Sequence, residues 1–263
     1  METYYRRHLP HYQPTGATYF ITFRLASSLP AEVIKGLLED REERDGKMPV
    51  SRNKPQPVNE LLRIHKSYFE RFDSFLDQAS TAPRWLQQAQ IAEIVREAIH
   101  FRDGLEYDLY TYCVMPNHVH TVFELLSKGA VSIGGRAATK NSARNKSSLP
   151  YPVTRILASL KKHTALGANR KLRRQGAFWQ DESYDHVVRD GEDLERILWY
   201  VIFNPEKAGL VKSWKDWKWT YCKPGLLWLE AGSLTRPNKR KRTGQRPVLH
   251  RYRLKKAISA VTM

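Results

Sequence analysis

The sequence predicts an α+β protein in which helices cover one face of an antiparallel four-stranded sheet. Short segments rich in β-branched and aromatic residues, with alternating apolar positions, indicate strands. Longer segments with apolar residues three or four positions apart indicate helices. Their order is β-α-β-β-α-β-α, with extra helices in the first crossover. This order is the split βαβ arrangement of ferredoxin-like and RRM-like folds.

Four segments are expected to be strands. The second and third should form a hairpin, because only the short turn Met115–Asn117 separates them. The predicted strands are Ala17–Leu25, Tyr107–Val114, His118–Leu125 and Glu182–Arg189.

Five segments are expected to be helices. One has Pro83 at its start, where a missing N–H group is tolerated. Asp190 is suited to cap the last helix, and Pro205 should end that helix at Asn204. The predicted helices are Ala31–Arg44, Val58–Ala79, Pro83–Phe101, Val153–Arg174 and Asp190–Asn204.

The length of 263 residues suits one large domain with additions. Residues 1–232 are expected to form this domain, with a helical insertion at about 31–101. Residues 128–150, rich in Ser, Gly, Ala, Asn and basic residues, should form a mobile loop. Residues 233–263 should be a flexible basic tail.

The positive charge is concentrated in two blocks. The net charge is +17, and the sequence pI is about 9.9. Residues 125–180 contain 12 Lys or Arg and no acidic residue, and the chain after Glu230 contains 10 and again no acidic residue. Such blocks favour a nucleic-acid partner. A membrane surface is a weaker interpretation, because the blocks lack an amphipathic helix with a Trp/Leu face.

Cysteine content and hydropathy indicate a cytoplasmic protein. Cys113 and Cys222 are the only cysteines, so neither a disulfide framework nor a cysteine zinc site is expected. The N-terminal segment lacks the apolar region of a secretory signal, and no apolar run approaches about 18 residues. We therefore expect no membrane partner.

Two histidines begin the third predicted strand. Because side chains alternate along a strand, His118 and His120 point to the same face, and Val119 points to the other. Two neighbouring imidazoles can chelate a metal ion or hold a phosphate. Short His-x-His patterns also arise by chance, so a structural role stays open at this point.

The last predicted helix carries a second pair of polar residues. Tyr200 and Asn204 are four residues apart, so they lie one turn from each other beside an apolar stripe. An amide fixed at a helix end is a plausible metal ligand next to a phenol nucleophile. The alternative is that Tyr200 packs as an aromatic ring and Asn204 caps the helix.

These motifs together resemble a known family. PNHVH followed by a helix with Y-V-I-F-N-P resembles the single-tyrosine HUH transposases, most closely the REP-associated tyrosine transposases. GATYFITFRL, FWQ with DHVVRD, and NPEKAGLV also match, in the same order over much of residues 4–220. The helical insertion, the loop at 128–150 and the tail lengthen the chain beyond a minimal family core. They leave DNA specificity and regulation open.

The resemblance implies metal-dependent cleavage and rejoining of single-stranded DNA at hairpins or repetitive palindromic elements. It implies that Tyr200 attacks the phosphodiester and forms a 5′-phosphotyrosine intermediate. It also implies that His118, His120 and Asn204 hold a divalent cation, Mg²⁺ or Mn²⁺. The cation would polarise a phosphate oxygen, because a phosphodiester repels an incoming anion. The tyrosine needs activation, since a phenol has a reference pKa of about 10.

Other residues are weaker candidates. Tyr184 is a rival nucleophile, although a tyrosine on a strand has no amide one turn away. The tryptophans at 214, 217 and 219 could stack on bases, but packing against the sheet is favoured. A basic helix face should contact phosphates, and the segment near the N-terminus corresponds to one that in relatives helps read DNA. The candidate DNA-binding residues are Arg6, Arg7, Gly16, Thr18, Lys161, Lys162 and His163.

Two further functions stay open from the sequence. One is an RRM-like nucleic-acid-binding module whose histidines are structural, and the other is a domesticated nickase that processes repeats without moving itself. The sequence predicts single-stranded or hairpin DNA as the partner. It does not distinguish a monomer from a homodimer, or a tyrosine acting on its own subunit's metal from one acting on a partner's.

Deletion of the tail tests the interpretation of the charge. Removing Ser233–Met263 eliminates 10 basic residues. It should weaken hairpin-DNA binding and flatten its salt dependence, because each phosphate contact contributes a slope near −0.7 on single strands. The measurement is the dissociation constant across a salt series. An unchanged slope would mean that the tail does not contact DNA.

Overall fold

The computed structural model describes residues 4–6, 10–14, 16–46, 69–79, 82–126 and 151–226. The predicted loop at 128–150, the tail at 233–263 and the first part of the helix predicted at Val58–Ala79 lie outside the described residues. Among the helices that the structure describes, none combines the length and apolar character needed to cross a membrane.

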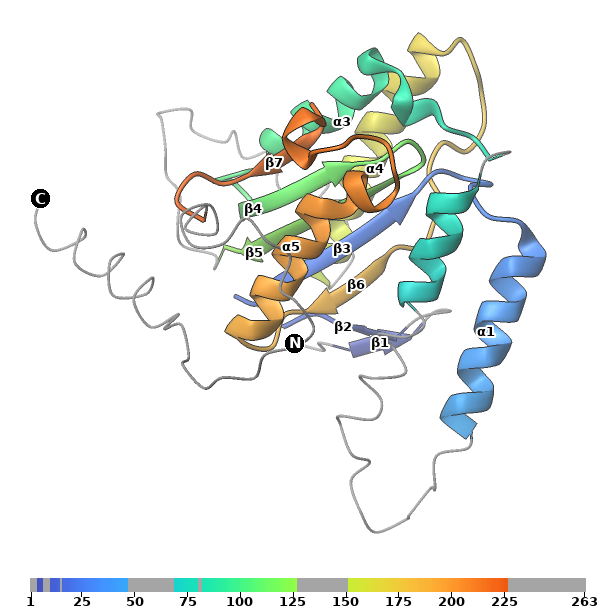
Figure 1. Ribbon diagram of the computed structural model, residues 1–263, viewed down its shortest axis with the longest axis vertical. Coiled ribbons are helices and arrows are strands. Elements are labelled where there is room, and N and C mark those ends of the chain that lie inside the picture. The colour runs from blue at the N-terminus through green and yellow to red at the C-terminus, as the bar shows by residue number, and fades with distance from the viewer. Residues whose placement is uncertain are drawn as a thin grey trace, which may run out of the picture.

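The described elements follow the predicted order closely (Figure 1). The strands are β1 Tyr4–Arg6, β2 Pro10–Tyr12, β3 Thr18–Arg24, β4 Tyr107–Val114, β5 His118–Leu125, β6 Tyr184–Val187 and β7 Thr220–Cys222. The helices are α1 Ala31–Gly46, α3 Ala89–His100, α4 Pro152–Lys171 and α5 Gly191–Lys207, with short 3₁₀ turns η1 Trp85–Gln87 and η3 Trp214–Asp216. A further helix includes residues 69–78.

The main sheet confirms the predicted fold. Its strand order is β6-β3-β5-β4-β7, and every neighbouring pair is antiparallel. The four predicted strands occupy the positions of a split βαβ unit, and the β4–β5 hairpin turns where it was expected. The short strand β7 extends the sheet beyond β4 and was not predicted from the sequence. Strands β1 and β2 form a separate two-stranded sheet.

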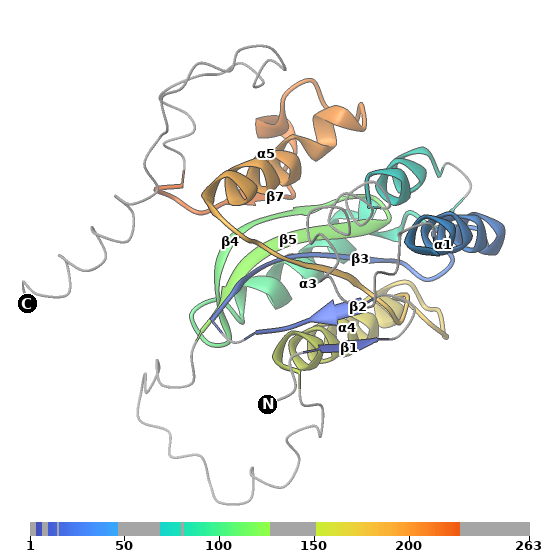
Figure 2. The same cartoon turned by 90° about the horizontal axis from the view of Figure 1, so that it is seen from below.

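Helices cover both faces of the sheet (Figure 2). The crossover helices α3 and α4 share one face, as predicted, and pack on alternate residues of β3 such as Tyr19, Ile21 and Phe23. Phe20 points to the other face, where it packs with the apolar stripe of α5 and with Phe69. The prediction that the helices lie on one face of the sheet therefore holds for the two crossover helices, α3 and α4. Helix α5 follows the last strand of the unit and covers the opposite side.

Two helix boundaries differ from the prediction. The segment predicted as one helix from Pro83 is divided into η1 and α3. Pro205 lies inside α5 instead of ending it. Proline removes one backbone donor, but Ala208 N still bonds to the Asn204 carbonyl at 2.9 Å, and the chain turns at Gly209, with φ of 68°. The additional turn brings Lys207 onto the face of α5 that carries Tyr200.

The tryptophans after α5 pack against the sheet. The ring of Trp219 is buried in the core under α3 and α4. Trp217 Nε1 donates to the Val114 carbonyl at 3.0 Å, which ties this segment to the end of β4. Packing, rather than base stacking, is therefore the role of these two rings in the structure.

Candidate active site

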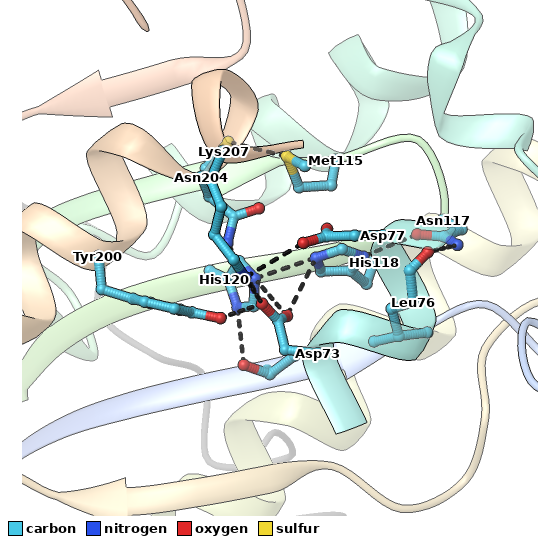
Figure 3. Close-up of polar contacts among 12 residues, drawn as sticks. Asp73, Leu76, Asp77, Met115, Asn117, His118, His120, Tyr200, Asn204 and Lys207 are labelled. Atoms are coloured by element: carbon cyan, nitrogen blue, oxygen red, sulfur yellow. Dashed lines mark hydrogen bonds and ion pairs between the residues drawn. The ribbon is translucent and has the colours of Figure 1, made fainter. Parts of the chain in front are cut away.

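His118 and His120 lie side by side on the sheet face that α5 covers (Figure 3). This arrangement confirms that the two residues, termed the histidine pair below, share one face. Both side chains are completely buried, and their Nε2 atoms are 3.0 Å apart.

Neighbouring polar groups set the orientation of both rings. Asn117 Nδ2 donates to the Leu76 carbonyl at 2.9 Å, so Asn117 Oδ1 faces His118 Nδ1 at 2.7 Å and accepts a hydrogen bond from its N–H group. This bond leaves the lone pair of His118 on Nε2. His120 Nδ1 is 2.8 Å from the Thr22 hydroxyl, which likewise leaves Nε2 facing the site. Burial and the neighbouring His120 lower the pKa of His118 to about 3, which favours the neutral form that binds metal ions.

Asp73, on the helix at 69–78, completes the cluster. Its Oδ1 lies 3.2 Å from His120 Nε2 and 3.6 Å from His118 Nε2. Three donor atoms of these residues lie within 4.8 Å of one another and could hold a metal ion. Ligands about 2.1 Å from one octahedral ion lie roughly 3 Å from each other, so the observed spacing is suitable. Sequence reasoning missed Asp73, because a lone aspartate in a distant helix gives no local signal.

Asn204, which was predicted from the sequence to be a metal ligand, lies beside this cluster (Figure 3). Its side chain is completely buried, and Nδ2 is 3.5 Å from Asp73 Oδ2. Among the described residues, Asn204 Oδ1 and Asp73 Oδ1 are buried oxygens with no hydrogen-bond donor. Buried polar atoms normally have a partner. The unpaired Asp73 oxygen beside the two ring nitrogens therefore fits a cation.

The Tyr200 hydroxyl also faces Asp73. It donates a hydrogen bond to Asp73 Oδ2, and its ring lies edge-on to His120 with centroids 5.5 Å apart. Burial, followed by the negative charge of Asp73, raises the pKa of the phenol well above its ordinary value. The phenol is therefore protonated at neutral pH. Tyr184, the rival nucleophile, stacks on Phe69 with centroids 4.4 Å apart.

Lys207 brings a positive charge to the same place. Its Nζ is 3.0 Å from Asp73 Oδ2 and 3.1 Å from Asp77 Oδ2. Burial alone would raise the pKa of Asp73, but the contacts with His120 and the ammonium of Lys207 outweigh it and hold that pKa well below its usual range. Asp73 is therefore a carboxylate in the structure.

The predicted DNA-binding residues that the structure describes lie on elements other than those that carry this cluster. Lys162 and His163 are exposed on α4, on the face of the sheet opposite α5. Lys161 Nζ is turned to the carbonyls of Gln180 and Asp181, at 2.8 and 2.9 Å. The remaining members are Arg6 in β1, Gly16 in the turn before β3, Thr18 at the start of β3, and Arg7, which lies outside the described residues.

Helix α5 is fixed at its start by two acidic residues, the exposed Asp190 and the buried Asp193. The carboxylate of Asp190 accepts from the backbone N–H of Asp193 at 2.8 Å and caps the helix, as predicted. Asp193 Oδ2 accepts from His186 Nε2 at 3.0 Å, and Oδ1 accepts from Arg196. The bond from His186 ties α5 to β6. Burial opposes ionisation, but the bonds from His186 and Arg196 outweigh it and hold the pKa of Asp193 well below its usual range.

The fold and the site together place a His-x-His strand against a helix that carries a tyrosine and an amide. This is the arrangement implied by the resemblance to single-tyrosine HUH transposases. Comparison with known proteins found one similar sequence among curated proteins. A protein of Haemophilus influenzae (strain ATCC 51907 / DSM 11121 / KW20 / Rd), provisionally named a REP-associated tyrosine transposase, is 26% identical over 115 residues. The inferred similarity to REP-associated tyrosine transposases is thereby confirmed.

The extent of these matches is limited. The aligned segment is 43% of this chain and 58% of the Haemophilus influenzae relative. A solved structure of a REP-associated tyrosine transposase bound to a REP hairpin aligns with 82% of this chain and 80% of its own. That alignment has 15% sequence identity and a TM-score of 0.39. No protein-family model matches the chain.

The anchor of α5 predicts a pH-dependent effect on stability. Asp193→Asn should reduce the free energy of unfolding at pH 6.5 by about 1.5–3 kcal/mol, the range for hydrogen bonds to a charged group. Because the folded-state pKa is depressed, this contribution is present above about pH 4, the unfolded-state pKa, and is lost as pH falls below it.

Urea unfolding at pH 6.5 and pH 3 measures this effect. The difference between the unmodified protein and Asp193→Asn should shrink at pH 3. Asp216→Asn, which alters an exposed carboxylate, serves as the control and should have little effect at pH 6.5. A difference of equal size at both pH values would contradict the assigned role of the Asp193 charge.

Proposed function

We propose that the protein is a metal-dependent endonuclease and strand transferase of single-stranded DNA, with Tyr200 as the nucleophile. The observation that supports this most is a convergence on one buried carboxylate. The Tyr200 hydroxyl and the Nε2 atoms of the histidine pair all lie against Asp73. A nucleophile next to a cluster of cation donors is what cleavage of a phosphodiester requires.

The donor set suits a divalent cation. The histidine pair would hold it through Nε2 and Asn204 through its buried Oδ1, and Asp73 Oδ1 would be a further ligand while no DNA is bound. A bound cation would supply positive charge that polarises a phosphate oxygen. We propose Mg²⁺ or Mn²⁺ from the family resemblance, since imidazole ligands by themselves suit several transition metals.

The protein's own part in the reaction is nucleophilic. The Tyr200 oxygen bonds to phosphorus as its proton is lost to solvent, and the bond from phosphorus to the 3′ oxygen breaks. The released 3′ oxygen takes up a proton, and the 5′-phosphate stays on the tyrosine. This ester conserves the free energy of the broken bond, so another strand's 3′-hydroxyl can reverse the step without ATP. The DNA is thereby cut and rejoined.

Single-stranded DNA next to a hairpin or a repetitive palindrome is the proposed substrate. The two acid-free basic blocks of the sequence support a DNA partner. The name of the Haemophilus influenzae relative supports a repetitive palindromic element. In this proposal the basic residues of α4 contact DNA phosphates. These contacts contribute affinity but do not recognise the base sequence.

Replacement of the nucleophile tests the proposal directly. Tyr200→Phe removes one oxygen and keeps the ring, which packs against Phe20 and Phe69. The free energy of unfolding should fall by no more than about 3 kcal/mol, since the hydrogen bond to Asp73 is lost. The covalent protein–DNA adduct should disappear, while binding of hairpin DNA persists.

The adduct is measured with end-labelled single-stranded hairpin DNA and Mg²⁺ or Mn²⁺ on a denaturing gel. Tyr184→Phe is the matched control and should still form the adduct. A band that persists in Tyr200→Phe and disappears in Tyr184→Phe would reverse the assignment. No band from the unmodified protein on several hairpins would favour the RRM-like binding module.

A second test concerns the cation. His120→Ala should abolish the adduct and the heat of Mn²⁺ binding in calorimetry, because a ligand is removed. Hairpin affinity should stay within about twofold, since phosphate contacts elsewhere supply most of it. His100→Ala changes a half-buried histidine outside the site and should leave both signals intact. Unfolding of His120→Ala, or normal Mn²⁺ binding by it, would favour structural histidines.

A further inference from the structure

The Asp73 carboxylate stands between the two halves of the candidate site. Its Oδ1 lies 3.2 and 3.6 Å from the two Nε2 atoms of the histidine pair. Its Oδ2 faces α5 and accepts from the Tyr200 hydroxyl, from Lys207 Nζ at 3.0 Å, and from Asn204 Nδ2 at 3.5 Å (Figure 3). Three donors of α5 thus converge on one anionic oxygen.

A scissile phosphodiester would need the same surroundings. It carries one negative charge shared by two non-bridging oxygens, as a carboxylate does. One oxygen must face the cation donors, and the other must face protein donors beside the nucleophile. Asp73 meets each of these requirements, with one oxygen toward the histidine pair and the other toward α5. The carboxylate therefore occupies the place that the proposed reaction requires for a phosphate.

Burial supports this interpretation. Asp73, Asn204 and the histidine pair have completely buried side chains, so this arrangement leaves them no surface that a DNA phosphate can contact. The Lys207 side chain, in contrast, is 41% exposed. Its stem can therefore follow an incoming phosphate at the edge of the site.

We propose that Lys207 is a catalytic residue that binds the scissile phosphate, and that Asp73 occupies the position of this phosphate until DNA enters. This inference rests on the proposed function. Tyr200, Asn204 and Lys207 are four and three residues apart, so one face of α5 presents the nucleophile, the amide and the ammonium together. Asp77, 3.1 Å from Lys207 Nζ, is a positioning residue that keeps the ammonium directed at the site after Asp73 withdraws.

Lys207 would stabilise the negative charge that develops on the phosphate during the reaction. As the bond from Tyr200 to phosphorus forms and the bond to the 3′ oxygen breaks, negative charge grows on the non-bridging oxygens. An ammonium beside one of these oxygens stabilises that charge, and the surrounding buried groups exclude water that would screen it. Lys207 keeps its proton throughout the step.

A hairpin with an uncharged scissile linkage isolates the interaction between Lys207 and the phosphate charge. The cleaved linkage is first mapped with the unmodified protein, and a hairpin is then made with a methylphosphonate at that linkage, which removes the anionic oxygen. Lys207→Gln should slow adduct formation on the phosphodiester by about 100-fold, the effect of losing one transition-state donor. On the methylphosphonate it should slow the reaction far less. Lys212→Gln, at an exposed position outside the site, should leave both rates unchanged.

Equal slowing of Lys207→Gln on both substrates would overturn the assignment, because the residue would then act without contacting the phosphate charge. An unchanged rate on the phosphodiester would overturn it as well. If the unmodified protein forms no adduct at all, the proposed function fails instead, and this outcome is distinct from the other two.

A binding measurement tests Asp73 without any cleavage. Asp73→Ala should create an anion site, so inorganic phosphate should raise the midpoint of thermal unfolding relative to chloride at equal ionic strength. The unmodified protein should not respond, and Asp73→Ala with Lys207→Gln should lose the response. If Asp73→Ala unfolds, Asp73→Asn provides the same comparison with the side-chain volume kept. If phosphate does not raise the midpoint in a folded Asp73 variant, Asp73 does not occupy a phosphate site. An equal rise in the double variant would show that Lys207 does not bind the phosphate.

Discussion

The burial of one carboxylate is the constraint on which this site depends. A charged group without water is stable only when it is paired and hydrogen-bonded. Asp73 finds its partners on β5, in the histidine pair, and on α5, in Tyr200 and Lys207. Removing either set would leave the charge uncompensated. The helix at 69–78, the central strand and the last helix are thus held in one arrangement by a single side chain.

Helix α5 is positioned from both ends. Asp190 caps its start, Asp193 ties it to His186 of β6, and the contacts of Lys207 with Asp73 and Asp77 fix its last turn. The apolar stripe between them packs on the sheet. Contacts at both ends thus hold Tyr200 in one position, as its proposed role as a nucleophile requires.

The helix at 69–78 gives this chain a feature beyond the predicted four-stranded unit. It supplies Asp73 and Asp77 to the site, and its Phe69 packs with Tyr200 and Tyr184. An insertion that covers a site can both complete its charge balance and limit access to it. In the proposed mechanism these two effects are linked, because the residue that balances Lys207 also occupies the position of the substrate.

The sequence by itself determined the four strands of the split βαβ unit, the shared face of the histidine pair, and the one-turn spacing of Tyr200 and Asn204, because each depends on local periodicity. It could not determine the continuation of α5 through Pro205, since tertiary packing overrode the local preference. Only the tertiary structure brought Asp73 and Lys207 to the histidine pair. Contacts between residues more than 40 positions apart depend on how helices pack on a sheet, and no local pattern encodes them.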